Sequence, residues 1–208
     1  MAGFLGAALL SRRSTSHIHF VDIVPELMAA LENKLHLFYP DLTWKTHCID
    51  VAKLPLGQHD GNHLIIIAGV GGDLMIQFIE AINKKHPHLS LEFLLCPVQH
   101  QYALRQKLIE LDFGLKDEVL VEENKRFYEI IHVTSQVAQE INHNVKHSTE
   151  NNTKVTTVGD KIWQYESPEQ EKTVKKYLNN TLNHYLRVQQ GKHNNAQEIV
   201  EAYQRIVL

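Results

Sequence analysis

The sequence predicts an α/β fold in which a doubly wound sheet is followed by a C-terminal helical hairpin. Three observations predict it. Short aliphatic segments alternate with amphipathic segments of roughly 10–15 residues in the first half of the chain. Two strand-like segments then meet at the tight connection Glu123-Asn124, which is typical of an antiparallel hairpin. Two further amphipathic segments follow a polar stretch at 136–157.

Each expected element has a local signal. Proline begins two of the expected helices, at Pro25 and Pro168, and Ser167 is a typical N-cap residue. The expected strands are apolar runs that cover approximately residues 17–22, 44–50, 63–68, 91–96, 115–123 and 125–134. The expected helices cover approximately residues 3–13, 25–38, 73–85, 100–111, 168–190 and 195–206. The second helix is expected to bury one face, made of Leu27, Leu31, Leu35 and Phe38.

The composition favours a cytoplasmic globular protein. With 208 residues and 43% apolar content the chain can bury one core of ordinary size, and its net charge of −3 shows no basic surplus typical of nucleic-acid binding. Cys48 and Cys96 lie in apolar runs and are expected to be buried in a reducing compartment. No apolar run reaches the roughly 20 residues that span a membrane, and the apolar residues 2–10 precede Arg12 and Arg13, the reverse of a signal peptide. The closely spaced histidine pairs lack the spacing of a zinc site, so we expect no metal.

The chain is expected to divide into three parts. Residues 1–135 form the sheet domain, and residues 136–159, rich in Asn, His, Thr and Ser, form a flexible linker or excursion. Residues 160–208 form the helical hairpin, which must pack on the sheet domain or on a partner. Its expected apolar stripe consists of Val174, Tyr177, Leu178, Thr181, Leu182, Tyr185 and Val188.

Ligands in an open α/β sheet bind beyond the carboxyl ends of the strands, and three strand ends carry suggestive residues. Asp22 could accept hydrogen bonds from both hydroxyls of a ribose, or it could cap the helix that begins at Pro25. Asp50 could accept from the exocyclic amine of an adenine, or it could be an ordinary loop acid. The turn Ala68-Gly69-Val70-Gly71-Gly72 lets backbone approach a ligand, but it could equally serve tight packing. Together these ends suggest a nucleoside-binding site.

A fourth strand ends at Cys96-Pro97-Val98-Gln99-His100. Gln99 and His100 could reach a substrate base, which makes them the candidate catalytic residues. His100 could equally be an ordinary residue at the start of a helix.

These segments resemble the bacterial tRNA adenine-N1 methyltransferase (TrmK-like) family. That family shows an Ala-Gly-Met-Gly-Gly turn, a strand that ends in proline, a Leu-Arg pair on the next helix and a Tyr-Glu-Ile strand. The matching segments, in order, are Ile65 to Gly72, Leu94 to Val98, Leu104-Arg105 with Leu108, Asp117-Glu118, and Phe127-Tyr128-Glu129-Ile130. The resemblance covers approximately residues 3–134, and Val70 stands where the family usually has methionine.

The resemblance implies a Rossmann-like class I methyltransferase sheet that transfers a methyl group from S-adenosyl-L-methionine to N1 of an adenine in tRNA. The implied cofactor-binding residues are Gly3, Asp22, Ile23, Asp50, Val51, Ala68, Gly69, Val70 and Gly71. The family's first strand and main cofactor loop have no counterpart before Gly3-Phe4-Leu5. We therefore expect a domain that is incomplete at its N-terminus, with unpaired edges on the strands that end at Asp22 and at Ala68.

Two other functions remain open on the sequence alone. The chain could be a methyltransferase of the same fold that acts on a small molecule or a protein, since residues 136–208 are nearly neutral. It could also be an inactive remnant that serves as a binding module, because the main cofactor loop is not matched.

Overall fold

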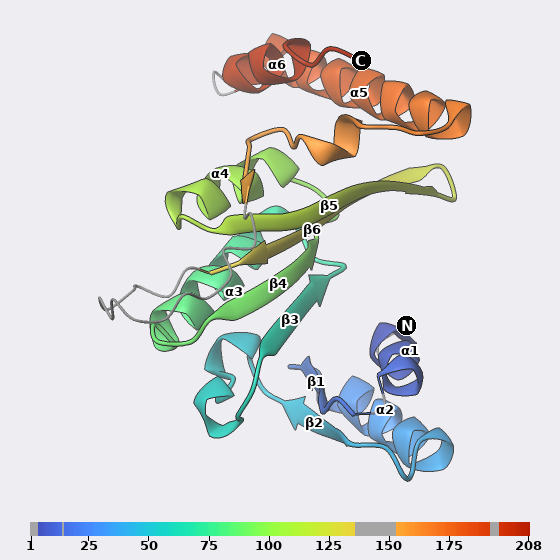
Figure 1. Ribbon diagram of the computed structural model, residues 1–208, viewed down its shortest axis with the longest axis vertical. Helices are drawn as coiled ribbons and strands as arrows, with labels where there is room; N and C mark the ends of the chain where they lie inside the picture. Colours follow the sequence, from blue (N-terminus) through green and yellow to red (C-terminus); the bar gives the residue numbers. More distant parts are fainter. Residues whose placement is uncertain (1–3, 14, 136–152, 192–195) are drawn as a thin grey trace. The chain divides into compact units, whose positions relative to one another are not determined.

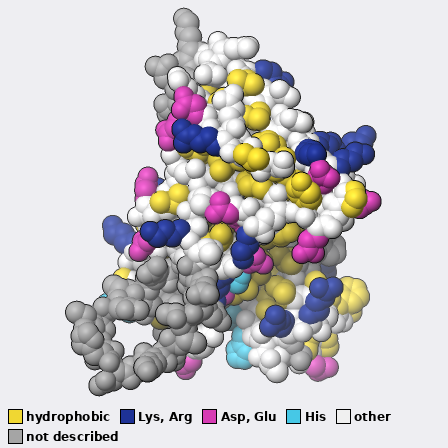
Figure 2. Space-filling view, turned by 45° about the horizontal axis from the view of Figure 1, so that its top comes forward, with side chains coloured by type: hydrophobic (Ala, Val, Ile, Leu, Met, Phe, Trp, Pro, Cys, Tyr) yellow, Lys and Arg dark blue, Asp and Glu magenta, His cyan; other side chains and the backbone are white. Residues whose placement is uncertain are grey.

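The computed structural model describes residues 4–13, 15–135, 153–191 and 196–208 (Figure 1). Its contacts divide the chain into two compact units, residues 1–58 and residues 59–208, and each unit is described by itself. No helix among the described residues is both long and apolar enough to cross a bilayer. On the face in Figure 2, acidic and basic side chains are interspersed and no large region carries one sign of charge.

The first unit is a parallel strand pair with two helices. Its elements in order are α1 (Phe4–Arg12), β1 (Ile18–Asp22), α2 (Pro25–Phe38), β2 (Trp44–Cys48), η1 (Val51–Lys53) and η2 (Leu56–Gln58). β1 and β2 pair in parallel, so that Asp22 lies opposite Cys48. The core consists of Leu10, Phe20, Met28, Leu31 and Leu35.

Two expectations for this unit are wrong in detail. The buried face of α2 uses Met28 beside Leu31 and Leu35, whereas Leu27 and Phe38 are 46% and 67% exposed. Positions 28, 31 and 35 follow the spacing of three and four residues that keeps side chains on one side of a helix. Cys48 is exposed rather than buried, since it is the last residue of a short strand.

The second unit contains a five-stranded sheet with the order β3-β4-β6-β5-β7. Its elements are β3 (His63–Ala68), α3 (Gly72–Lys85), β4 (Leu91–Cys96), α4 (Gln101–Glu110), β5 (Gly114–Glu123), β6 (Arg126–Thr134), β7 (Thr153–Lys154), η3 (Lys161–Trp163), α5 (Pro168–Gln190) and α6 (Ala196–Gln204). β3 and β4 are parallel, and β6 is inserted antiparallel between β4 and β5. The expected hairpin is therefore confirmed, and so are all the longer helices and strands to within a few residues.

The core of the second unit lies between this sheet and the helices α3 and α4, which run along the same side of it (Figure 1). Every second residue of β4 is fully buried because side chains alternate between the two faces of a strand. The apolar side chains of α3, α4, β4 and β6 with no or almost no exposed surface are Met75, Ile79, Ile82, Leu91, Phe93, Leu95, Leu104, Leu108, Ile131 and Val133.

β1 and β3 are both edge strands. Among the described residues β1 pairs only with β2, and β3 pairs on one side only, with β4. Unpaired edges were expected for these two strands. The aliphatic composition of β3 is typical of a strand inside a parallel sheet rather than at its edge.

The C-terminal hairpin packs on the sheet of its own unit, in agreement with its expected apolar stripe. Val174, Tyr177 and Leu178 of α5 join Tyr102, Ile162, Trp163 and Tyr203 in one buried cluster. The end of the segment expected to be a linker is part of this unit as well. Thr153 and Lys154 form β7 against β5, and Val155 is buried. The three-part division of the chain stays a prediction.

Candidate active site

Two aspartates lie at the carboxyl edge of the strand pair in the first unit. Oδ1 of Asp22 accepts a hydrogen bond from the backbone N–H of Val24 at 2.9 Å, and Oδ1 of Asp50 accepts from the N–H of Ala52 at 3.0 Å. Both contacts are Asx turns, which fix the carboxylate by a bond to the backbone two residues on. Asp50 thereby caps η1, but Asp22 is not the N-cap of α2, because Val24 occupies that position.

The two turns leave one oxygen of each carboxylate for a ligand. No described residue donates a hydrogen bond to Oδ2 of Asp22 or of Asp50. Carboxylates held in this way suit the hydroxyls and the exocyclic amine of a nucleoside, so these residues fit an adenosine-containing cofactor. Ile23 is largely exposed and Val51 is half-buried beside them.

The glycine turn of the second unit lies at the carboxyl end of β3. Gly69 has a φ of +80°, which glycine adopts without strain, and no atom lies near the place of its missing Cβ. Gly71 is the N-cap residue of α3. Ala68 lies opposite Cys96, so this turn and the loop after β4 begin side by side.

Two backbone hydrogen bonds join the glycine turn to the loop after β4. The N–H of Val98 donates to the carbonyl of Val70 at 3.0 Å, and the N–H of Gly72 donates to the carbonyl of Gln99 at 2.9 Å. A Cβ on Gly72 would lie 2.6 Å from the carbonyl oxygen of His100, so this close approach requires glycine. The tight-packing role that the sequence left open is therefore real for Gly72.

His100 contacts the first turn of α3 with its side chain. Its Nδ1 lies 2.7 Å from Oδ2 of Asp73, and the two side chains are 49% and 66% exposed. His100 also occupies the N-cap position of α4 in the left-handed region, with φ 61° and ψ 37°, and its side chain makes no capping bond. The side chain of Gln99 lies beside Gly71. The structure thus brings both candidate catalytic residues to the glycine turn.

Asp73 contacts the candidate residue His100 but was not among the residues that the sequence singled out. Its signal was an acid directly after Gly71-Gly72, in the first turn of the expected helix. Gly3, an expected cofactor residue, lies outside the described residues. In the part of the chain that the structure describes, no group of three His, Cys, Asp or Glu side chains could hold a metal ion.

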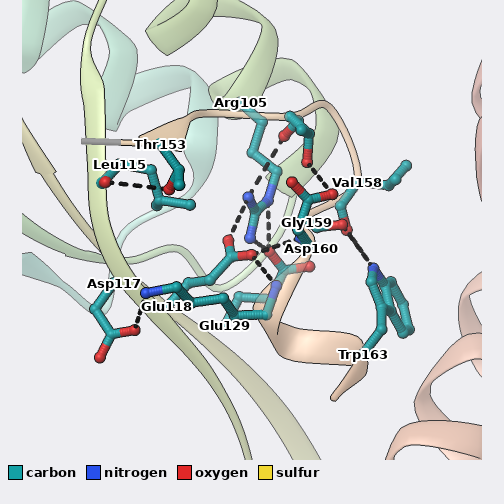
Figure 3. A network of polar contacts seen from close by, with 12 residues as sticks. Arg105, Leu115, Asp117, Glu118, Glu129, Thr153, Val158, Gly159, Asp160 and Trp163 are labelled. Atoms are coloured by element: carbon teal, nitrogen blue, oxygen red, sulfur yellow. Dashed lines mark hydrogen bonds and ion pairs between the residues drawn. The ribbon is translucent and has the colours of Figure 1, made fainter. Parts of the chain in front are cut away.

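A second polar network lies in the second unit, and its central side chains, Arg105, Glu118 and Glu129, are buried (Figure 3). The guanidinium of Arg105 forms ion pairs of 2.8 Å with Glu118 of β5 and with Glu129 of β6. Glu118 accepts from the backbone N–H groups of Asp160 and Lys161, at 2.6 and 2.8 Å. The network therefore connects α4, the sheet and the segment that leads into the hairpin.

The network contains one guanidinium and two carboxylates, and the carboxylates also accept hydrogen bonds from neutral N–H and O–H groups. Burial by itself lowers the pKa of Arg105, but the charges of Glu129 and Glu118 outweigh burial and raise it. The hydroxyl of Tyr177 donates to Glu129, and burial raises the pKa of Tyr177 well above its ordinary value. Because Arg105 is completely buried, its role is structural, and it does not contact a substrate.

Several solved structures have a similar fold, and the match extends over almost all of this chain. Mycoplasma capricolum TrmK, solved with S-adenosyl-homocysteine, is 15% identical with a TM-score of 0.68, over 98% of this chain and 85% of that chain. Streptococcus pneumoniae Sp1610, described as a putative tRNA (m1A22) methyltransferase, is 14% identical with a TM-score of 0.66, over 97% and 86%. The Bacillus subtilis m1A22 tRNA methyltransferase TrmK is 17% identical with a TM-score of 0.61, over 97% and 83%.

These likenesses confirm the Rossmann-like methyltransferase fold. No curated protein matches the sequence. Residues 2–131 match the family described as "Methyltransferase domain", which is more than half of the chain. The chain therefore belongs to this family of methyltransferase domains.

Proposed function

We propose that the protein is an S-adenosylmethionine-dependent methyltransferase that methylates N1 of an adenine in tRNA, in the cytoplasm. The observation that carries the proposal is the extent of the likeness to M. capricolum TrmK. That likeness covers 98% of this chain, whereas the family match ends at residue 131. It therefore includes the C-terminal hairpin, which the family match does not reach.

The cofactor is proposed to bind at the strand ends. In the first unit, Asp22 and Ile23 would hold the ribose, and Asp50 and Val51 would hold the adenine. For Ala68, Gly69, Val70 and Gly71 of the second unit, a role in cofactor binding stays an expectation from the resemblance. Gly3 completes this set as an expectation from the sequence. Available carboxylate oxygens at Asp22 and Asp50 support this assignment. Bound there, S-adenosylmethionine supplies a methyl group on a positively charged sulfur.

The protein then has to orient the adenine and exclude water from the site. N1 of adenine carries a lone pair, so no strong base has to act before the methyl transfer. Catalysis then depends on alignment of N1 with the methyl group and on stabilisation of the positive charge that the base acquires. Gln99 and His100 are proposed to contact the base, because they lie beside the glycine turn.

The test is a methylation assay on unmodified tRNA transcripts with isotope-labelled S-adenosylmethionine. After nuclease digestion, mass spectrometry should find the label in N1-methyladenosine. Asp22→Ala and Asp50→Ala should lose labelling while they keep their fold. Asp41→Ala is the matched control, since Asp41 is exposed in the turn between α2 and β2. Label in another nucleoside, or none at all, contradicts the proposal.

One observation favours a second candidate, a methyltransferase of the same fold that acts on a small molecule or a protein. The chain has a net charge of −3, and its charged side chains are interspersed in Figure 2, whereas an RNA-binding surface usually concentrates Lys and Arg. Transfer of label from S-adenosylmethionine to a small-molecule or protein fraction, with none to tRNA, would identify this alternative.

A further inference from the structure

The two loops at the carboxyl edge of β3 and β4 hold His100 in a left-handed backbone conformation. The backbone hydrogen bonds from Val98 to Val70 and from Gly72 to Gln99 fix the loop that carries His100 against the start of α3. His100 has a φ of 61°, in the left-handed region that costs a side-chain-bearing residue roughly 1 kcal/mol or more. Residues kept in this region against that cost are concentrated at functional sites.

The contact with Asp73 decides which ring nitrogen of His100 carries hydrogen. A carboxylate oxygen can only accept, so Nδ1, at 2.7 Å from Oδ2 of Asp73, must donate. In the neutral imidazole the other nitrogen, Nε2, then has a lone pair and can only accept. The side chain of His100 is about half exposed, so a ligand can reach it.

We propose that Nε2 of His100 accepts a hydrogen bond from the exocyclic amine of the target adenine, and that Asp73 positions His100 for this contact. The inference rests on the proposed function. An adenine presents an N–H donor at this position, whereas a guanine presents a carbonyl oxygen, which would face the acceptor unfavourably. The pair would therefore select adenine as well as orient it.

The same contact would favour the transition state. A bond forms between N1 and the methyl carbon while the carbon–sulfur bond breaks, and the electron pair of that bond goes to sulfur. The base thereby becomes a cation, and its amine becomes a stronger hydrogen-bond donor. An acceptor supported by the carboxylate of Asp73 binds this amine more tightly than it binds the amine of the neutral base, so it lowers the barrier.

The tautomer of His100 can be measured without any substrate. Long-range proton–nitrogen NMR of the intact chain distinguishes the two ring nitrogens of each histidine, and the spectrum of His100→Gly identifies the signals of His100. The expected result is hydrogen on Nδ1 in the wild type and a shift toward hydrogen on Nε2 in Asp73→Asn. Hydrogen on Nε2 of neutral His100 in the wild type would overturn the proposal.

The contact with the base is tested by a double-mutant cycle. The methylated adenosine in the transcript is replaced by purine riboside, which lacks the amine, and the rate is measured with the wild type and with His100→Gly. The change in N1 nucleophilicity affects both enzymes equally and cancels. Loss of the amine should slow the wild type about 3- to 10-fold more than it slows His100→Gly, the range of one hydrogen bond.

The matched control is Asp112→Gly. Asp112 also has a positive φ, 55°, and is exposed at the other end of α4. Both glycine variants relax the backbone, so both should keep or raise the melting temperature, but only His100→Gly should lose rate. Equal effects of the missing amine on wild type and His100→Gly would overturn this inference alone. Absence of any tRNA methylation by the wild type would overturn the proposed function together with it.

Discussion

Replacement of Arg105 by methionine tests whether the buried network holds the second unit together. Arg105 has no exposed side-chain surface, and the variant would leave the carboxylates of Glu118 and Glu129 buried without their cation. Removal of one partner from a buried ion pair costs about 3–5 kcal/mol, and here two carboxylates lose the same partner. Typical domains have free energies of unfolding of about 5–15 kcal/mol, so Arg105→Met should lose a large fraction of that stability.

The assay is urea unfolding followed by tryptophan fluorescence. The chain has two tryptophans, Trp44 in the first unit and Trp163 beside the network, so a Trp44→Phe background isolates the second unit. Lys107→Met on the same helix is the matched control, because Lys107 pairs with carboxylates at the surface, and it should not shift the midpoint measurably. Addition of Glu129→Gln to Arg105→Met should restore part of the stability. A loss below about 1 kcal/mol for Arg105→Met would refute this account of the network.

Three further predictions concern single residues. Gly72→Ala should lower the free energy of unfolding by about 1–3 kcal/mol in urea titrations, because its Cβ would lie 2.6 Å from the carbonyl oxygen of His100; an unchanged midpoint would contradict this contact. Ser167→Ala should cost about 1 kcal/mol, since its hydroxyl accepts from the N–H of Gln170 at the start of α5, and Ser167→Gly should cost less. Burial by itself raises the pKa of Glu92, but hydrogen bonds from Lys116 and His132 outweigh it, and the pKa is lower than the ordinary 4.5. A depressed carboxyl pKa stabilises the fold above the unfolded-state pKa, so the wild type should exceed Glu92→Gln at pH 7, and this advantage should disappear as the pH falls below about 4.5.

The elements themselves could be predicted because their signals are local. β3 and α2 match the expected ranges, since an aliphatic run and an N-terminal proline each act within a few residues. Burial was harder to predict. Phe38 and Cys48 are apolar, but they lie at the ends of short elements and remain exposed.

The contacts between distant residues could not be predicted from one sequence. Arg105 meets Glu129 only because β6 is inserted between β4 and β5. Asp73 meets His100 only because two backbone bonds hold the loops after β3 and β4 together. Residues 153–157 have a polar, linker-like composition, but β5 offers them a free edge, and β7 forms there.

The most direct test of the central claim is calorimetric titration of the chain with S-adenosylmethionine. The account predicts saturable binding at one site, with Asp22→Ala weaker by about 1–3 kcal/mol, the range for loss of charged hydrogen bonds. Asp41→Ala, at an exposed position between α2 and β2, should bind like the wild type. No binding by the wild type, or an affinity that Asp22→Ala leaves unchanged, would contradict the assignment of these strand ends to the cofactor.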